Sequence, residues 1–150
     1  MNTIEVSNGD IKLKNGKISF VTGTNKLIQD LSRWLQEPLG TGFTTPNFGS
    51  TLYQYIGTTQ ADLSTSAIES EVYRVLQLYQ GQQILDLQKA QNSATLSNWN
   101  KSEVIQSIVS INAYAQQSTV VVAVELNTLN NNLVNMNIII NNDGMTIQNG

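Results

Sequence analysis

Three runs rich in β-branched residues near the C-terminus define the architecture: SIVSINAYAQQ (residues 107–117), TVVVAVELN (119–127) and LVNMNIII (133–140). Polar and apolar residues alternate in the first run, and a period of two is typical of a half-buried β-strand. Asn-rich segments favour turns between the runs. The sequence therefore predicts an antiparallel meander of three strands. After Asp143-Gly144, residues 145–147 are predicted to form a short edge strand.

Two stretches of this meander are apolar on both faces. Val120-Val121-Val122 and Ile138-Ile139-Ile140 each place side chains on both sides of the sheet, and such runs need cover on each side. The helices of a chain this short cover one face of the sheet. No lysine guards the sheet edge, although monomeric proteins often protect edges in that way. We therefore expect another subunit to complete this sheet, with Val121 and Ile139 among the contacts.

The N-terminal part of the sequence predicts a hairpin followed by a helix. Alternating apolar residues flank Asn15-Gly16, a pair that adopts positive φ readily, so strands are expected at 10–14 and 17–21. Residues 25–36 have apolar residues at helical spacing, and Pro38 ends the predicted helix. The apolar stripe of this helix contains Leu27, Ile28, Leu31, Trp34 and Leu35.

Residues 37–50 contain both prolines of the chain and three glycines, so an ordered loop is expected there, followed by a short helix that Gly57 closes. A longer helix should begin at Ala61-Asp62, bend or break at Gly81 and continue to about residue 91. Its predicted buried stripe contains Leu63, Ala67, Ile68, Val72, Val75, Leu76 and Tyr79. A helical turn at 102–105 leads into the meander. The fold class is α+β, and residues 1–150 are expected to form one domain.

Composition excludes several classes of function. The chain has no cysteine and no histidine, so it lacks thiolate ligands, disulfides and the commonest general base. A net charge of −3 argues against binding to nucleic acid, and the absence of a long apolar stretch argues against a membrane span. The first residues lack the features of a signal peptide, so we expect the chain in a cytoplasm. Charged residues make up only 13% of the chain, which suggests a surface that meets other proteins.

Carboxylates are the remaining candidates for acid–base chemistry. Asp30 and Glu37 are the one pair with the potential to work together as in a glycosidase, although a solvated Asp30 and a local loop contact for Glu37 are the simpler expectation. Trp34 is expected in the core, whereas Trp99 either closes the end of the sheet or marks a partner contact. Each of the two arginines, Arg33 and Arg74, is expected either to make a forked contact with a carboxylate or carbonyl group or to lie solvated on the surface. No cofactor or metal site is predicted.

The loop and its flanks resemble the gp25-like family, the baseplate wedge proteins or sheath initiators of contractile phage tails and related injection machines. The matching residues are Gln29-Asp30, Leu39-Gly40-Thr41, Pro46-Asn47-Phe48-Gly49-Ser50, Leu52 and Ile56-Gly57. The order of a strand pair, a helix, a glycine-containing loop, an apolar helix and a β-meander is similar over about residues 9–140. Many members carry an arginine just before the proline of the loop. Residues 41–45 and Leu39 contain none, so an arginine-mediated contact is not expected here.

The resemblance implies a structural protein of a tail baseplate, without catalytic activity. Six copies would surround the tube and contact other wedge proteins, the sheath protein and tube or hub proteins. Loop residues Glu37, Pro46, Phe48 and Gly49 would lie at such contacts, and strand addition to the C-terminal sheet would start sheath assembly. The chain would reside in the virion after assembly in the bacterial cytoplasm. Two alternatives stay open: a peptidoglycan-cleaving enzyme that uses Asp30 and Glu37, and a free-standing ligand-binding domain.

Overall fold

The computed structural model describes residues 3–7, 10–41, 47–57, 64–93 and 99–150. Pro46, the helix start predicted at Ala61-Asp62, and Leu63 lie outside the described residues. The described elements combine helices with antiparallel sheet, so the α+β class predicted from the sequence is confirmed.

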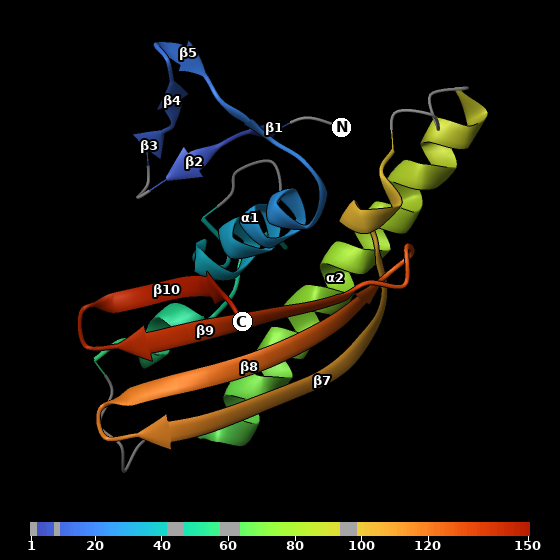
Figure 1. The fold of residues 1–150 in the computed structure, drawn as a ribbon. Coiled ribbons are helices and arrows are strands. Elements are labelled where there is room, and N and C mark those ends of the chain that lie inside the picture. Colours follow the sequence, from blue (N-terminus) through green and yellow to red (C-terminus); the bar gives the residue numbers. More distant parts are fainter. Residues whose placement is uncertain (1–2, 8–9, 42–46, 58–63, 94–98) are drawn as a thin grey trace.

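Four antiparallel strands form the C-terminal sheet in the order β10-β9-β8-β7 (Figure 1). They are β7 (Ile105–Gln116), β8 (Thr119–Thr128), β9 (Leu133–Asn141) and β10 (Gly144–Asn149). The three predicted strands of the meander are therefore confirmed, and both ends of each strand lie within two residues of the prediction. The edge strand β10 is longer than the three residues that the sequence indicated, because its ladder with β9 continues to Asn149.

One face of this sheet forms the core. Val120, Val122, Val124 and Leu126 on β8 are buried, as are Val134, Met136, Ile138 and Ile140 on β9. These side chains join leucines of α1 (Gly23–Gln36) and the apolar stripe of α2 (Thr65–Asn92) in one cluster. In Figure 1, α2 runs along the back of β7 and β8. The alternation of exposed and buried residues is what places Val121 and Ile139 on the opposite face.

The N-terminal strands form a small unit that projects from the body, which we call the N-terminal arm (residues 3–7 and 10–21; Figure 1). The predicted turn at Asn15-Gly16 is confirmed, with both residues at positive φ. The sequence reading missed the strand formed by residues 3–7. Its first half pairs with Phe20–Val21 and its second half with Asp10–Ile11, each through a ladder of two residues. The elements are β1 (Thr3–Ile4), β2 (Val6–Ser7), β3 (Asp10–Ile11), β4 (Leu13–Lys14), β5 (Lys17–Ile18) and β6 (Phe20–Val21).

The helices differ from the sequence-based prediction in two details. First, α2 continues through Gly81 without a break, because the flanking residues keep their helical pattern. Second, Ala67 is exposed, since the buried stripe starts at Ile68 and uses Gln83 and Ala90 at its far end. Ser64 caps α2 by accepting a hydrogen bond from the Ala67 N–H. The short helix predicted after the loop is the 3-10 helix η1 (Leu52–Tyr55). The helical turn predicted at 102–105 is the 3-10 helix η4 (Lys101–Glu103), which ends earlier because Ile105 begins β7.

Candidate functional site

The two edges of the C-terminal sheet differ in how their backbone groups are used. At the β7 edge, α2 supplies side chains that bind the outward backbone. Glu69 Oε1 accepts from the Ala113 N–H at 2.8 Å, and Gln80 Nε2 donates to the Gln106 carbonyl at 3.0 Å. Gln83 binds both the Ile105 N–H and the Glu103 carbonyl. A helix that occupies an edge in this way protects it against pairing with another strand.

The β10 edge is more open. The Gly150 N–H donates to the Asn135 carbonyl, which fixes the hydrogen-bonding pattern between β9 and β10. The backbone N–H and C=O groups of even-numbered residues in β10 therefore point toward β9, and those of odd-numbered residues point outward. Among the described residues, one outward group of β10 is bound by a side chain: the Met145 carbonyl, which accepts from Gln36 at 3.2 Å. The outward N–H and C=O of Ile147 have no hydrogen-bond partner within the described segments. The edge therefore presents a free donor and a free acceptor to another strand.

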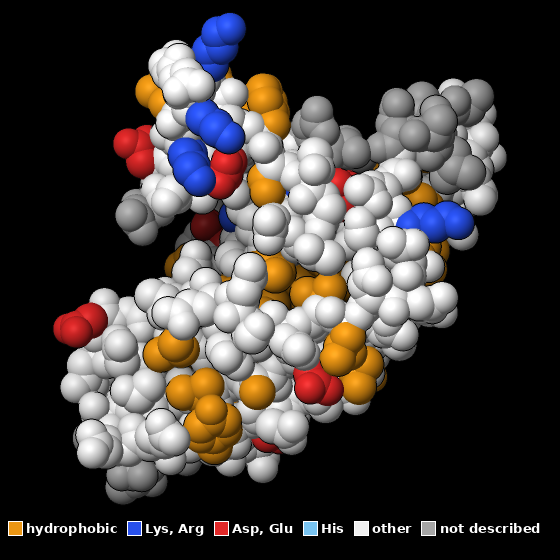
Figure 2. All heavy atoms as spheres, viewed as in Figure 1, with side chains coloured by type: hydrophobic (Ala, Val, Ile, Leu, Met, Phe, Trp, Pro, Cys, Tyr) orange, Lys and Arg blue, Asp and Glu red, His pale blue; other side chains and the backbone are white. Residues whose placement is uncertain are grey.

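A groove of about 790 Å³ runs beside this edge, between β10, α1 and the N-terminal arm. Its apolar lining comes from Val6, Val21, Ile28 and Ile147, and its polar lining includes Gln29 and Arg33. In Figure 2 the surface is hollowed between the arm and the sheet. The free edge of β10 thus lies in a concave site with both apolar and polar walls, which is the setting that an added strand requires.

The second face of the C-terminal sheet carries an apolar row. Tyr114 pairs with Val121, Val121 with Ile139 and Ile139 with Thr146, so these four side chains share one line across the sheet. Tyr114 is 46% exposed, and Val121 and Ile139 are half-buried. The neighbouring row is polar apart from Ala123, and apolar side chains are visible on this face in Figure 2. The expectation that apolar residues occupy both faces is therefore confirmed, whereas their cover by another subunit stays a prediction.

The loop after α1 is held by a close backbone approach at Gly49. This glycine is buried and has φ +107°, and a Cβ added to it would lie 2.5 Å from the Glu37 carbonyl oxygen. The approach permits a two-way bridge: Ser50 donates to the Glu37 carbonyl at 2.8 Å, and Leu39 donates to the Ser50 carbonyl at 3.0 Å. The prediction that Gly49 needs positive φ or a close approach is confirmed. Sequence reasoning singled out this residue because an aromatic precedes it and a helix follows it.

The same loop is tied to α2 through Arg74. Its guanidinium donates to both carboxylate oxygens of Glu71, at 2.6 and 2.8 Å, and to the Gly49 carbonyl at 3.2 Å. Glu71 in turn accepts from the Thr51 N–H at 2.8 Å. Burial alone raises the pKa of Glu71, but the hydrogen bonds from Arg74 and Thr51 outweigh it and hold this pKa below its ordinary value. Arg74 thus makes the forked contact, whereas Arg33 is exposed and has no side-chain partner among the described residues.

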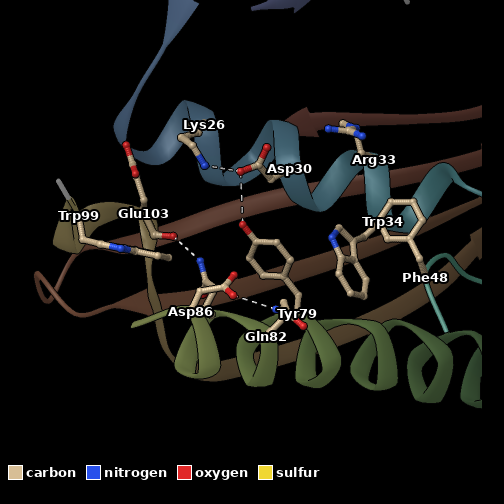
Figure 3. A pocket seen from close by; sticks show the side chains of 11 residues that line it. Lys26, Asp30, Arg33, Trp34, Phe48, Tyr79, Gln82, Asp86, Trp99 and Glu103 are labelled. Atoms are coloured by element: carbon tan, nitrogen blue, oxygen red, sulfur yellow. Dashed lines mark hydrogen bonds and ion pairs between the residues drawn. The ribbon is translucent and has the colours of Figure 1, made fainter. Parts of the chain in front are cut away.

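Both tryptophans of the chain line a cleft of about 340 Å³ between α1 and α2, which we call the tryptophan cleft (Figure 3). Trp34 packs edge-to-face against Phe48 at 4.8 Å and against Tyr79 at 5.7 Å. Trp34 is half-buried and packs against the core, so its prediction as a core residue holds in part. Trp99 lies at the other end of the cleft, beside Asp86 and Glu103 (Figure 3).

The structure places the two candidate catalytic carboxylates differently. Asp30 lines the tryptophan cleft, binds Lys26 Nζ at 2.5 Å and accepts from the Tyr79 hydroxyl at 3.4 Å. Burial and the nearby Asp30 charge raise the pKa of Tyr79 well above its ordinary value. Glu37 is exposed, accepts from the Thr41 hydroxyl at 3.0 Å and is not among the cleft-lining residues. The local loop contact expected for Glu37 is present, and Asp30 is ion-paired rather than freely solvated.

Comparison with known proteins returned no match to any family model, curated protein or solved structure. Within the described segments, no three His, Cys, Asp or Glu side chains gather in a way that would hold a metal ion. Among the described helices, none is both long and apolar enough to cross a membrane.

Proposed function

We propose that this chain is a structural component of a contractile-tail baseplate that contacts wedge proteins and the first ring of sheath subunits. It adds a strand from a neighbouring subunit to its C-terminal sheet, and six copies surround the tube. Tube or hub proteins are further neighbours in this arrangement. The chain is assembled into the tail in the bacterial cytoplasm, carries out no catalysis and needs no cofactor.

The observation that carries this proposal is the free backbone at Ile147. Its outward N–H and C=O lie in the groove beside β10, while α2 side chains bind the β7 edge. Strand addition gains affinity from such main-chain hydrogen bonds and specificity from pockets for alternate side chains. The apolar row of Tyr114, Val121 and Ile139 supports the proposal independently, because it offers a second surface for a protein partner.

The test replaces Ile147 in two ways. Ile147→Pro removes the outward N–H, and proline is tolerated on an edge strand where that group faces away from the ladder. Ile147→Ala keeps the N–H and removes most of the same partly buried side chain. Each variant is co-expressed with the sheath and wedge proteins encoded beside it, and its incorporation into tails is quantified. We expect Ile147→Pro to abolish incorporation and Ile147→Ala to retain most of it.

Equal incorporation of the two variants would contradict addition at the β10 edge. Val121→Pro or Ile139→Lys should also block incorporation more than either change lowers helix content. Circular dichroism of the purified variants verifies that each variant keeps its helices.

A further inference from the structure

The tip of the N-terminal arm presents two positive charges that have no ion-pair partner in the described part of the chain. Lys14 and Lys17 lie directly opposite each other across the β4–β5 turn, and like charges in that position destabilise a hairpin. Neither lysine makes an ion pair with a described residue, whereas Lys12 binds Glu5 at 2.8 Å. The neighbouring apolar pair is also uncovered: Leu13 is 62% exposed and Ile18 is 49% exposed. The tip therefore combines cationic and apolar groups that the rest of the described chain leaves without partners.

The arm is held in a fixed relation to the body. Gln29 on α1 accepts from the Val6 N–H at 3.0 Å and donates to the Ile4 carbonyl at 2.9 Å. These two bonds fasten the base of the arm, and the β4–β5 turn lies at its far end, away from α2 (Figure 1). The tip is thus presented outward rather than folded against its own chain.

Charge is divided between the arm and the body. Residues 1–21 carry three lysines and two carboxylates, a net charge of +1, so the remaining residues carry the balance of −4 from a total of −3. Because the arm is cationic and the body is anionic, the arm of one copy is attracted to the body of another copy.

The tryptophan cleft supplies the matching site on the body. Five charged side chains line it: Lys26, Arg33, Asp30, Asp86 and Glu103. Lys26 is paired with Asp30, and Arg33 is exposed and lies at the Trp34 end in Figure 3. Asp86 has a neutral donor, Gln82 at 2.9 Å, and no cation within ion-pair distance among the described residues. The Trp99 end of the cleft is therefore acidic.

Aromatic groups complete the acidic end. Trp99 and Tyr79 line the cleft near Asp86, and the buried Glu103 carboxylate accepts from the Gly23 N–H at 2.9 Å. An ammonium group is attracted both to carboxylates and to the faces of tryptophan and tyrosine rings. The methylene stem of a lysine packs on apolar surface while its charged end reaches the polar groups.

From this complementarity we infer that the Lys14–Lys17 tip of one copy docks at the Trp99 end of the tryptophan cleft of the next copy. The contact is head-to-tail, and a contact of that kind closes into a ring when the rotation between copies permits it. The number of copies in the closed assembly rests on the proposed function. The contact between two copies rests on the charged and aromatic side chains described above. Because few groups take part, the purified chain should associate weakly and lose the association in high salt.

The experiment uses the purified full chain with no tail protein present, so its outcome is separate from that of the incorporation assay. A water-soluble carbodiimide joins a lysine amine to a carboxylate in direct contact. We expect intermolecular cross-links from Lys14 or Lys17 to Asp86, identified by mass spectrometry of mixed isotope-labelled and unlabelled chains. Cross-links confined to other pairs, or absence of intermolecular cross-links at millimolar protein, would overturn the inference.

Charge exchange provides the matched controls. Lys14→Glu with Lys17→Glu should weaken self-association by about tenfold or more in sedimentation equilibrium, because like charges then meet at the cleft. Asp86→Lys should weaken it similarly, and mixing the two variants should restore it. Asp143→Lys makes the same change of charge as Asp86→Lys at an exposed turn residue that does not line the cleft, and it should leave the self-association unaltered. Failure of the mixture to associate, or an equal loss in Asp143→Lys, would show a general charge effect and overturn the inference.

Discussion

Replacing Gly49 by alanine tests whether the loop after α1 is held by close backbone contact. The added Cβ would lie 2.5 Å from the Glu37 carbonyl oxygen and 3.0 Å from the Pro38 carbonyl carbon, and neither backbone atom can rotate away. The residue would also hold φ +107°, which costs an L-residue about 1–3 kcal/mol. Relief of the clash lengthens the bridge between Glu37 and Ser50, whose hydrogen bonds contribute about 0.5–1.5 kcal/mol each.

These contributions predict a loss of about 2–5 kcal/mol in the free energy of unfolding. For a chain of this size, each kcal/mol lowers Tm by about 2–4 °C, so a loss of 3 kcal/mol lowers it by about 6–12 °C. Urea unfolding followed by circular dichroism measures the free energy, and thermal unfolding measures Tm.

Gly40 provides the matched control within the same loop. It has φ +86°, and a Cβ added there meets no atom within 4 Å. Gly40→Ala should therefore cost only the conformational strain, about 1–2 kcal/mol. Equal losses for Gly40→Ala and Gly49→Ala would refute the argument that close approach, rather than φ, requires glycine at position 49.

Three further outcomes are expected. Gly81→Ala should raise the free energy of unfolding by about 0.5–1 kcal/mol in urea titrations, since Gly81 lies inside α2 with open space around its Cα; a lower stability would contradict an unbroken α2. The low pKa of Glu71 contributes stability that is fully present above its ordinary value of 4.5 and is lost as pH falls through the folded pKa. Glu71→Gln should therefore destabilise the chain at pH 7 and flatten its acid unfolding curve, and an unchanged curve would count against the Arg74 contact. Turbidity assays on bacterial cell walls should detect no clearing by the parent chain; clearing that disappears in Asp30→Asn or Glu37→Gln would instead support the peptidoglycan-cleaving alternative.

The sequence predicted those elements whose signals are local. The Asn15-Gly16 turn, the stop at Pro38 and the period-two runs each depend on a few neighbouring residues, and all three are present in the structure. The strand at 3–7 was missed although Asn8-Gly9, the same kind of turn-favouring pair as Asn15-Gly16, follows it directly in the sequence. Its pairing with Phe20–Val21 depends on a contact between segments distant in the sequence, which no local pattern indicates. Of the bend or break predicted at Gly81, the break is absent, because a single glycine costs a helix about 1 kcal/mol and packing along the rest of α2 outweighs that. The predicted continuation to about residue 91 is confirmed.

The candidate site depended more on tertiary contacts than on pattern. The apolar runs at 120–122 and 138–140 correctly indicated that apolar side chains lie on both faces of the sheet. Strand alternation places Val121 and Ile139 on the face opposite the core. The difference between the two sheet edges could not be predicted, since it depends on Glu69 and Gln80 of α2 reaching β7 across the fold. Likewise, no spacing in the sequence indicates that Trp34 and Trp99, 65 positions apart in the numbering, line one cleft.

A cryo-electron microscopy map of the assembled tail would show directly whether a neighbouring subunit adds a strand to β10. We predict a strand from a neighbouring subunit beside β10, at the spacing of about 4.8 Å found between paired strands, with its backbone hydrogen-bonded to Ile147. We also predict protein density over the row formed by Tyr114, Val121 and Ile139. A map in which the β10 edge and this row both face solvent would contradict these predictions.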